Sequence, residues 1–334
     1  MHDCLSICDA NATLEYLTEQ FCNHEEPKIL EKPVLSFSDH PDSQPSPDEE
    51  IVTGDLPSTL RGPPMKCLVP PGQCQFGPLP LRVPLIQRIP VTETTAVLRF
   101  ALPHRSHPLN LSTCACLYAH AEIDGQMVKR PYTPISTNIY VGSFDLLVKN
   151  YGPTAKMSRK LHELQPGDDS ISFSHGPDNV KIQADDFIHG QYDHIGMLVG
   201  GTGITPMIQA LHALLGNNGK REPRITLLYG SRTSGEILAK TLLHKWSKYY
   251  DQFTLVHVLS DEPAYSLWDD GVRGHITKEL IEQYFPSAGS ETRQKIFVCG
   301  PPGMYDALCG PREQSSVSGV LGDLGFLPEQ VYKF

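Results

Sequence analysis

The chain has 334 residues, and its 38 acidic and 28 basic side chains give a formal net charge of −10. The acidic excess lies at the N-terminus: residues 1–60 hold 13 acidic and two basic residues, which leaves residues 61–334 near +1. This length suggests about two domains. The near-neutral body excludes a general nucleic-acid-binding protein, whose phosphate contacts require clustered lysine and arginine.

Several other classes of protein are disfavoured by the same survey. No stretch approaches the roughly 18 consecutive apolar residues of a membrane span, and the first thirty residues carry no signal-peptide or transit-peptide pattern. The nine cysteines include no CxxC pair, and the HxxH of His104 and His107 has no further ligands nearby. We expect no metal site. We expect a soluble cytoplasmic protein, with peripheral membrane association and the oligomeric state left open.

The N-terminal segment is predicted to lie outside the folded body. Residues 1–60 are rich in Asp, Glu, Ser and Pro, a composition that cannot bury enough apolar surface to offset chain entropy, so a largely disordered acidic tail is expected. A helical spacing over residues 11–22 predicts a transient helix, with a docking element as the alternative. The prolines of residues 61–80 predict a stiff linker.

Residues 81–185 show a period-two pattern with frequent turns. One helix interrupts the series, with Met157, Leu161 and Leu164 on a common face. Short strands separated by turns favour an antiparallel β-barrel over this range, or a sandwich. The expected strands include residues 81–83, 97–100, 117–123 and 144–148.

Residues 190–334 change to short apolar strands that alternate with helices. This alternation predicts an α/β domain with a parallel sheet and right-handed crossovers. The expected strands are 195–199, 225–229, 253–258 and 296–299, and the clearest helices are 206–215 and 236–250. The predicted fold class is therefore α+β with two domains, an antiparallel β-barrel followed by an α/β parallel-sheet domain.

Ligands of open α/β sheets bind beyond the carboxyl ends of the strands. The first of these strands is followed by a glycine-rich turn in which Gly201, Thr202 and Gly203 predict an anion or dinucleotide cradle. Thr205 is expected to cap the next helix. The turn is not a GxGxxG motif, because Pro206 stands in the third glycine's place. The other strand ends carry Gly230-Ser231-Arg232, Ser260-Asp261 and Cys299-Gly300-Pro301.

The barrel region contributes the segment RPYTPIS at residues 130–136. Arginine offers a fixed fork to a pyrophosphate, tyrosine a flat stacking face, and threonine a hydroxyl for a ring nitrogen. Together with Leu147-Val148-Lys149, Lys156-Met157-Ser158, GGTGITPM at 200–207, CGPPGM at 299–304 and the ending QVYKF, this segment resembles the cytochrome b5 reductase branch of the ferredoxin-reductase-type flavoproteins. The resemblance covers about residues 80–334.

The resemblance implies that the barrel binds FAD and the α/β domain binds NADH. Arg130 would hold the FAD pyrophosphate, and Pro131 belongs to the same segment. Tyr132 would pack on the flavin and its ribityl chain, and Thr133 would hydrogen-bond near flavin N5. Further FAD contacts are implied at Leu147, Lys149, Lys156, Met157, Ser158 and Thr205.

The nicotinamide would lie beside Cys299, Gly300 and Pro301, and the residues implied in catalysis are Thr133, Lys149 and Cys299. Asp261 matches an acidic position that favours NADH by meeting the ribose hydroxyls. Arg232 instead favours NADPH, because an arginine at this position can bind its 2′-phosphate. The expected cofactors are FAD and NADH, with NADPH as the alternative.

The implied activity is hydride transfer from NADH to the flavin, followed by single-electron transfer to an external haem protein such as cytochrome b5. The first alternative is an NADPH-preferring reductase with a ferredoxin-like or quinone acceptor, and Arg232 motivates it. The second is a non-catalytic flavin-binding scaffold whose acidic tail binds a partner.

Overall fold

A computed structural model describes residues 55–65, 69, 71–177, 179–181, 192–216 and 222–334. The predicted acidic tail up to residue 54 and the predicted helix over residues 11–22 lie outside this range. Within the described residues no helix is long and apolar enough to cross a membrane. The same residues contain no group of three or more His, Cys, Asp or Glu side chains arranged to hold a metal ion.

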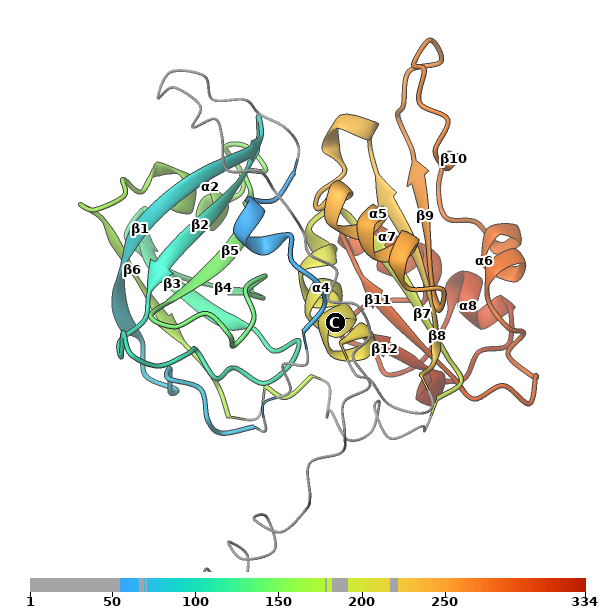
Figure 1. The fold of residues 1–334 in the computed structure, drawn as a ribbon, viewed down its shortest axis with the longest axis horizontal. Helices are drawn as coiled ribbons and strands as arrows, with labels where there is room; N and C mark the ends of the chain where they lie inside the picture. The colour runs from blue at the N-terminus through green and yellow to red at the C-terminus, as the bar shows by residue number, and fades with distance from the viewer. Residues whose placement is uncertain (1–54, 66–68, 70, 178, 182–191, 217–221) are drawn as a thin grey trace, which may run out of the picture. The chain divides into compact units, whose positions relative to one another are not determined.

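The first half of the chain forms an antiparallel sheet of six strands in the order β4-β3-β6-β1-β2-β5 (Figure 1). This agrees with the predicted antiparallel barrel. The side chains of Phe76, Phe100, Phe144 and Phe173 fill its interior, with ring centroids 5.0–6.0 Å apart. The strands are β1 Leu81–Thr92, β2 Thr95–Ala101, β3 Leu117–Ile123, β4 Gln126–Tyr132, β5 Ser143–Lys149 and β6 Ser170–Ser174.

Strand β1 is much longer than the three residues that the pattern predicted. It continues through Pro84 and Pro90, and its pairing with β2 shifts register between Leu85 and Gln87 and again between Pro90 and Thr92. Each shift changes which face the side chains point to, so the period-two signal is lost. Helix α2, Lys156–Glu163, interrupts the strands as predicted and buries Met157 and Leu161, and the buried Leu164 follows its last residue.

The second half forms a six-stranded sheet in the order β10-β9-β8-β7-β11-β12, in which every neighbouring pair is parallel. The predicted α/β domain is therefore correct. The strands are β7 His194–Gly200, β8 Arg224–Ser231, β9 Phe253–Leu259, β10 Val272–Arg273, β11 Gln294–Cys299 and β12 Val331–Lys333. The helices are α4 Ile204–Leu215, α5 Lys240–Tyr249, α6 Lys278–Tyr284, α7 Pro302–Leu308 and α8 Gly319–Asp323.

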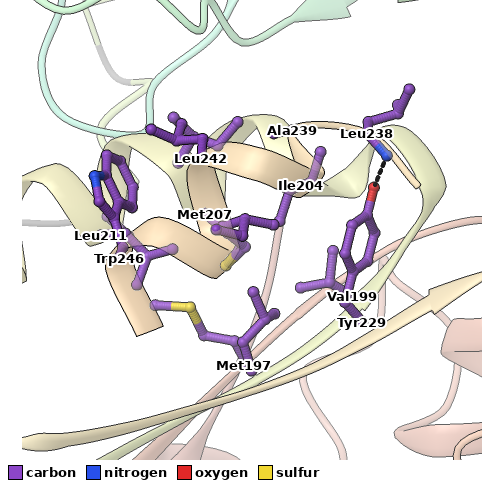
Figure 2. Packing of buried hydrophobic residues seen from close by; sticks show 14 of the residues in the cluster. Met197, Val199, Ile204, Met207, Leu211, Tyr229, Leu238, Ala239, Leu242 and Trp246 are labelled. Atoms are coloured by element: carbon purple, nitrogen blue, oxygen red, sulfur yellow. Dashed lines mark hydrogen bonds between the residues drawn. The ribbon is translucent and has the colours of Figure 1, made fainter. Parts of the chain in front are cut away.

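Helix α5 begins four residues later than the predicted helix over 236–250. Ala239 adopts a left-handed φ of 57°, which interrupts a right-handed helix, and the buried Leu238 N–H donates to the Tyr229 hydroxyl at 3.3 Å. Figure 2 shows this bond beside the apolar residues that pack α4 and α5 on the sheet. Residues 234–236 instead form a separate short 3₁₀ helix, η3.

Residues 55–65, which we call the strap, are packed, although the sequence assigned them to the tail and the linker. Leu56 and Leu60 are 2% and 6% exposed and belong to the core around α4 and α5. Trp246 donates its indole N–H to the Gly62 carbonyl at 3.2 Å, and Tyr140 of the barrel half donates to Thr59. The strap therefore contacts both halves of the protein.

The end of the strap is held by a buried histidine. The Met65 N–H donates to Nδ1 of His212 at 3.1 Å. Burial lowers the pKa of His212 to about 4, so near pH 7 the ring is neutral and Nδ1 keeps the lone pair that accepts this bond.

The proline-rich stretch after the strap is also packed where it is described. Phe76 is 2% exposed inside the barrel, and the Gln75 side chain bonds to the backbone of the loop at residues 104–108. The prediction of a stiff linker over residues 61–80 therefore fails for this part. Prolines fix backbone angles but do not prevent a neighbouring phenylalanine from being buried.

Deleting residues 1–61 is expected to destabilise the protein much more than deleting residues 1–54. The longer deletion removes the buried Leu56 and Leu60, each worth about 1.5–3 kcal/mol of buried apolar surface. Urea unfolding of both truncated proteins and the full chain measures the difference. Equal unfolding midpoints for the two truncations would show that the strap adds no stability.

Candidate functional site

A cavity of about 1220 Å³ lies where the barrel faces the carboxyl ends of the parallel strands. Every site residue predicted from the sequence lines it except Asp261. The barrel side contributes Arg130, Pro131, Tyr132, Thr133, Leu147, Lys149, Lys156, Met157 and Ser158. The α/β side contributes Gly201, Thr202, Gly203, Thr205, Arg232, Cys299, Gly300 and Pro301.

The two glycine-containing turns meet because β7 and β11 are neighbours in the sheet. A Cβ atom on Gly203 would overlap the carbonyl oxygen of Cys299 and lie 2.6 Å from its carbonyl carbon. A Cβ atom on Gly200 would lie 2.8 Å from Sδ of Met304. At Gly203 only glycine allows this close approach, because the atoms that a Cβ would meet belong to the backbone of Cys299 and Gly300.

Thr205 does not cap helix α4 as predicted. The helix begins at Ile204 and its N-cap residue is Gly203, so Thr205 lies inside the first turn and its hydroxyl donates to the Thr202 carbonyl at 3.2 Å. A threonine within a helix can satisfy its hydroxyl on a preceding carbonyl in this way. The first turn of α4 still lines the cavity, and the positive end of its helix dipole favours an anion.

The motif at residues 130–133 lies at the end of edge strand β4. Pro131 fits there because an edge strand tolerates a missing N–H donor. The exposed Arg130 donates to the Lys129 carbonyl at 2.8 Å, and burial raises the pKa of Tyr132, so its hydroxyl stays protonated. The N-terminus of α2, at Lys156, lines the same wall.

Two contacts cross the cavity from the barrel half to the α/β half. Lys149 at the end of β5 places Nζ 2.6 Å from Oε2 of Glu236, and the hydroxyls of Tyr151 and Thr202 are 2.7 Å apart. Neither Glu236 nor Tyr151 was predicted as a site residue. The period-two alternation of β5 could have indicated Tyr151, which follows Lys149 by two positions.

Three cysteines line the cavity, of which the sequence singled out only Cys299. Burial raises the pKa of Cys299 to about 11, although Tyr305 and two cations oppose the shift. Its thiol is therefore neutral near pH 7 and suits packing rather than nucleophilic attack. Cys114 is buried with φ of 62°, and its N–H donates to Gln209 at 2.7 Å. Cys116 completes the set.

Asp261 lies just outside the cavity wall but contacts it through a neighbour. Its Oδ2 accepts from Nε of Arg232 at 3.1 Å and from the Ser260 hydroxyl at 3.2 Å. The hydrogen bond with Arg232 is the largest cause of the lowered pKa of this carboxyl. Asp261, which was predicted to favour NADH, and Arg232, which was predicted to favour NADPH, therefore form one exposed ion pair.

The donor set fits two dinucleotides. The cavity exceeds the roughly 300–1,000 Å³ of a site for one drug-sized ligand. It offers guanidinium and ammonium groups, helix N-termini and a wall of glycine backbone, which are the groups that recognise pyrophosphates.

Comparison with known proteins places these features in a family. The oxidoreductase FAD-binding domain family matches residues 82–178, and the oxidoreductase NAD-binding domain family matches residues 197–310. NADH-cytochrome b5 reductase 2 of Yarrowia lipolytica is 38% identical over 249 residues, which cover 73% of this chain and 82% of that protein. The protein of the same name from Pyricularia oryzae is 38% identical over 253 residues, covering 73% and 72%.

Solved structures agree on the fold. The cytochrome b5 reductase domain of Ulva prolifera nitrate reductase superposes with a TM-score of 0.62 at 23% identity, covering 80% of this chain and all of that one. The CS-b5R domains of human Ncb5or, in the NAD+ form, also give a TM-score of 0.62, at 24% identity, covering 77% and 69%. The structure matches show the shared fold, and the sequence relatives show that the chain belongs to the NADH-cytochrome b5 reductase family.

Proposed function

We propose that this protein is an FAD-dependent oxidoreductase that passes hydride from NADH to the flavin and then single electrons to a haem protein such as cytochrome b5. One observation carries the proposal: a single cavity joins the RPYT segment of the barrel to all four predicted strand ends, the one at residues 260–261 through Ser260. The names of the relatives support both the nucleotide and the acceptor.

On the barrel side, the protein's own groups would bind and orient FAD. The Arg130 guanidinium would take the pyrophosphate, helped by the N–H groups at the start of α2. Tyr132, with its hydroxyl protonated, would provide a flat packing surface. The Thr133 hydroxyl would bind near the flavin's reactive nitrogen.

On the α/β side, the chain would position the nicotinamide nucleotide. The backbone at Gly201–Gly203 and the N-terminus of α4 would bind its phosphates. The neutral Cys299 thiol would pack against the nicotinamide with Gly300 and Pro301, and this close packing would exclude water from the reacting face. When bound, the flavin supplies the redox chemistry, because it accepts a two-electron hydride and releases single electrons.

Absorbance of the purified protein tests the proposal. It is expected to be yellow, or to become so with FAD, and the flavin band should bleach within seconds of adding NADH under anaerobic conditions. Reoxidation should then follow the reduction of added cytochrome b5. Colourless protein that takes up no FAD, or bound flavin that NADH does not bleach, would refute it.

The Arg232–Asp261 pair favours NADH over NADPH in this proposal. Removing the carboxylate in Asp261→Ala frees Arg232 for a 2′-phosphate and removes a repulsive charge, so the ratio of kcat/KM for NADPH to that for NADH should rise by about tenfold or more. Steady-state rates with ferricyanide measure it. Asp269→Ala, which removes a charge from the same loop, is the control. An unchanged ratio would remove Asp261 from the specificity argument.

A second candidate function is that of an NADPH-preferring reductase with a ferredoxin-like or quinone acceptor. Its support is Arg232, which lines the cavity at the end of β8. Wild-type protein that uses NADPH better than NADH would favour this candidate.

A further inference from the structure

Glu236 places a carboxylate beside two cations that line the same cavity. Its Oε2 lies 2.6 Å from Nζ of Lys149. Its charge is also among the causes of the raised pKa of Arg232, after the larger effect of the Asp261 hydrogen bond. All three side chains line the cavity. The carboxylate therefore neutralises positive charge where an anionic ligand would be received.

The backbone on both sides of Glu236 is fixed. Before it, the Ser234 N–H and hydroxyl both donate to the Glu262 carboxylate, at 2.6 and 2.9 Å. After it, the Leu238 N–H donates to the buried Tyr229 hydroxyl, the bond drawn in Figure 2. These contacts fix the backbone that carries the Glu236 side chain.

Lys149 is fixed from the other half of the protein. It ends strand β5 and pairs with Thr95 on β2. The side chains of Lys149 and Glu236 are 22% and 31% exposed, so water screens their attraction less than it would at an open surface. A phosphate that binds Lys149 has to compete with a carboxylate already at hydrogen-bond distance.

We propose that Glu236 weakens the binding of the nicotinamide dinucleotide by competing with its phosphates for Lys149, and so speeds its release. The inference rests on the proposed function, because it requires that the cavity binds this nucleotide. Glu236 belongs to the α/β half and acts on Arg232 at the end of β8 as well as on Lys149, so we assign the competition to the nicotinamide nucleotide rather than to FAD. If Glu236 instead helped to assemble the site, its removal would weaken binding.

Titration of FAD-loaded protein with NAD+ shows whether the loss of Glu236 strengthens or weakens nucleotide binding. Glu236→Gln should lower the Kd for NAD+ by about five- to tenfold in calorimetric titrations. The free energy of a partly exposed ion pair such as Glu236–Lys149 corresponds to roughly this change in Kd. Glu282→Gln removes one negative charge from an exposed position on α6 and should leave the Kd unchanged. An equal or higher Kd for Glu236→Gln overturns the proposal.

A double-mutant cycle tests whether Lys149 carries the effect. In a Lys149→Met background the gain from Glu236→Gln should disappear. If Glu236→Gln still increases the affinity for NAD+ in this background, Glu236 does not act through Lys149. If Glu236→Gln tightens the binding of FAD but not of NAD+, the competition does not concern the nicotinamide nucleotide. Should the glutamine variant fold poorly, Glu236→Asp, which retracts the carboxylate, should give a smaller gain of the same sign.

These results are separable from a failure of the proposed function. If NADH does not reduce the flavin of the wild-type protein, the proposed function fails. If NADH reduces it but the Kd for NAD+ does not respond to Glu236→Gln, only the role of Glu236 fails.

Discussion

Gly203→Ala is expected to lower the melting temperature by about 5–10 °C and to slow flavin reduction by NADH about hundredfold. The new methyl group would overlap the Cys299 carbonyl, and because that group is backbone, strand β11 or helix α4 has to move. Such overpacking costs about 3 kcal/mol. A displacement of about 1 Å at the nicotinamide site accounts for the kinetic loss.

Calorimetry and stopped-flow reduction measure the two effects. Gly289→Ala is the matched control, because a Cβ there meets no atom within 4 Å and no left-handed φ is involved. It should leave both quantities unchanged. If Gly203→Ala behaves like this control, the contact between the two glycine turns does not shape the site.

Arg130→Ala is expected to weaken FAD binding by about ten- to hundredfold, so that the protein loses flavin during purification. The guanidinium is the fork-shaped donor on the barrel wall of the cavity, and charge-assisted bonds to a phosphate are worth this much. Arg130→Lys keeps the charge but not the fork, so an intermediate loss is expected.

The flavin content of purified protein and FAD release on dilution, followed by fluorescence, measure the loss. Lys129→Ala changes the same charge one residue away, but Lys129 lies over the Tyr118 ring, with Nζ 4.1 Å from its centroid, and does not line the cavity. FAD binding as tight in Arg130→Ala as in Lys129→Ala would exclude Arg130 from the pyrophosphate site.

The strand ends of the α/β half could be read from the sequence because their signals are local. A buried apolar strand followed by glycine, as at Gly200 or Gly300, identifies an end of the sheet without knowledge of the rest of the fold. Parallel topology then brings these ends to one edge. The sequence located Arg232 and Asp261 at two of these strand ends but did not predict that they pair, and the structure joins them in a hydrogen bond.

Contacts between distant segments left no such signal. Glu236 looked like the first residue of a helix, and nothing near it in sequence indicates Lys149, which belongs to the other half. The strap was misjudged for the same reason. Its few apolar residues stand in a polar, proline-rich stretch, and the bonds from Met65 to His212 and from Trp246 to Gly62 span 147 and 184 positions.

The strap also gives the nucleotide-binding half of this protein an interior that its own stretch of sequence does not complete. Leu56 and Leu60 belong to a core that contains Ile195 and Leu242 of this half as well as Val97 and Leu147 of the barrel. An excised fragment that starts at the second sheet would lack part of its own interior. Domain dissection or chimera design therefore has to carry residues 55–65 with the C-terminal half, for example by circular permutation.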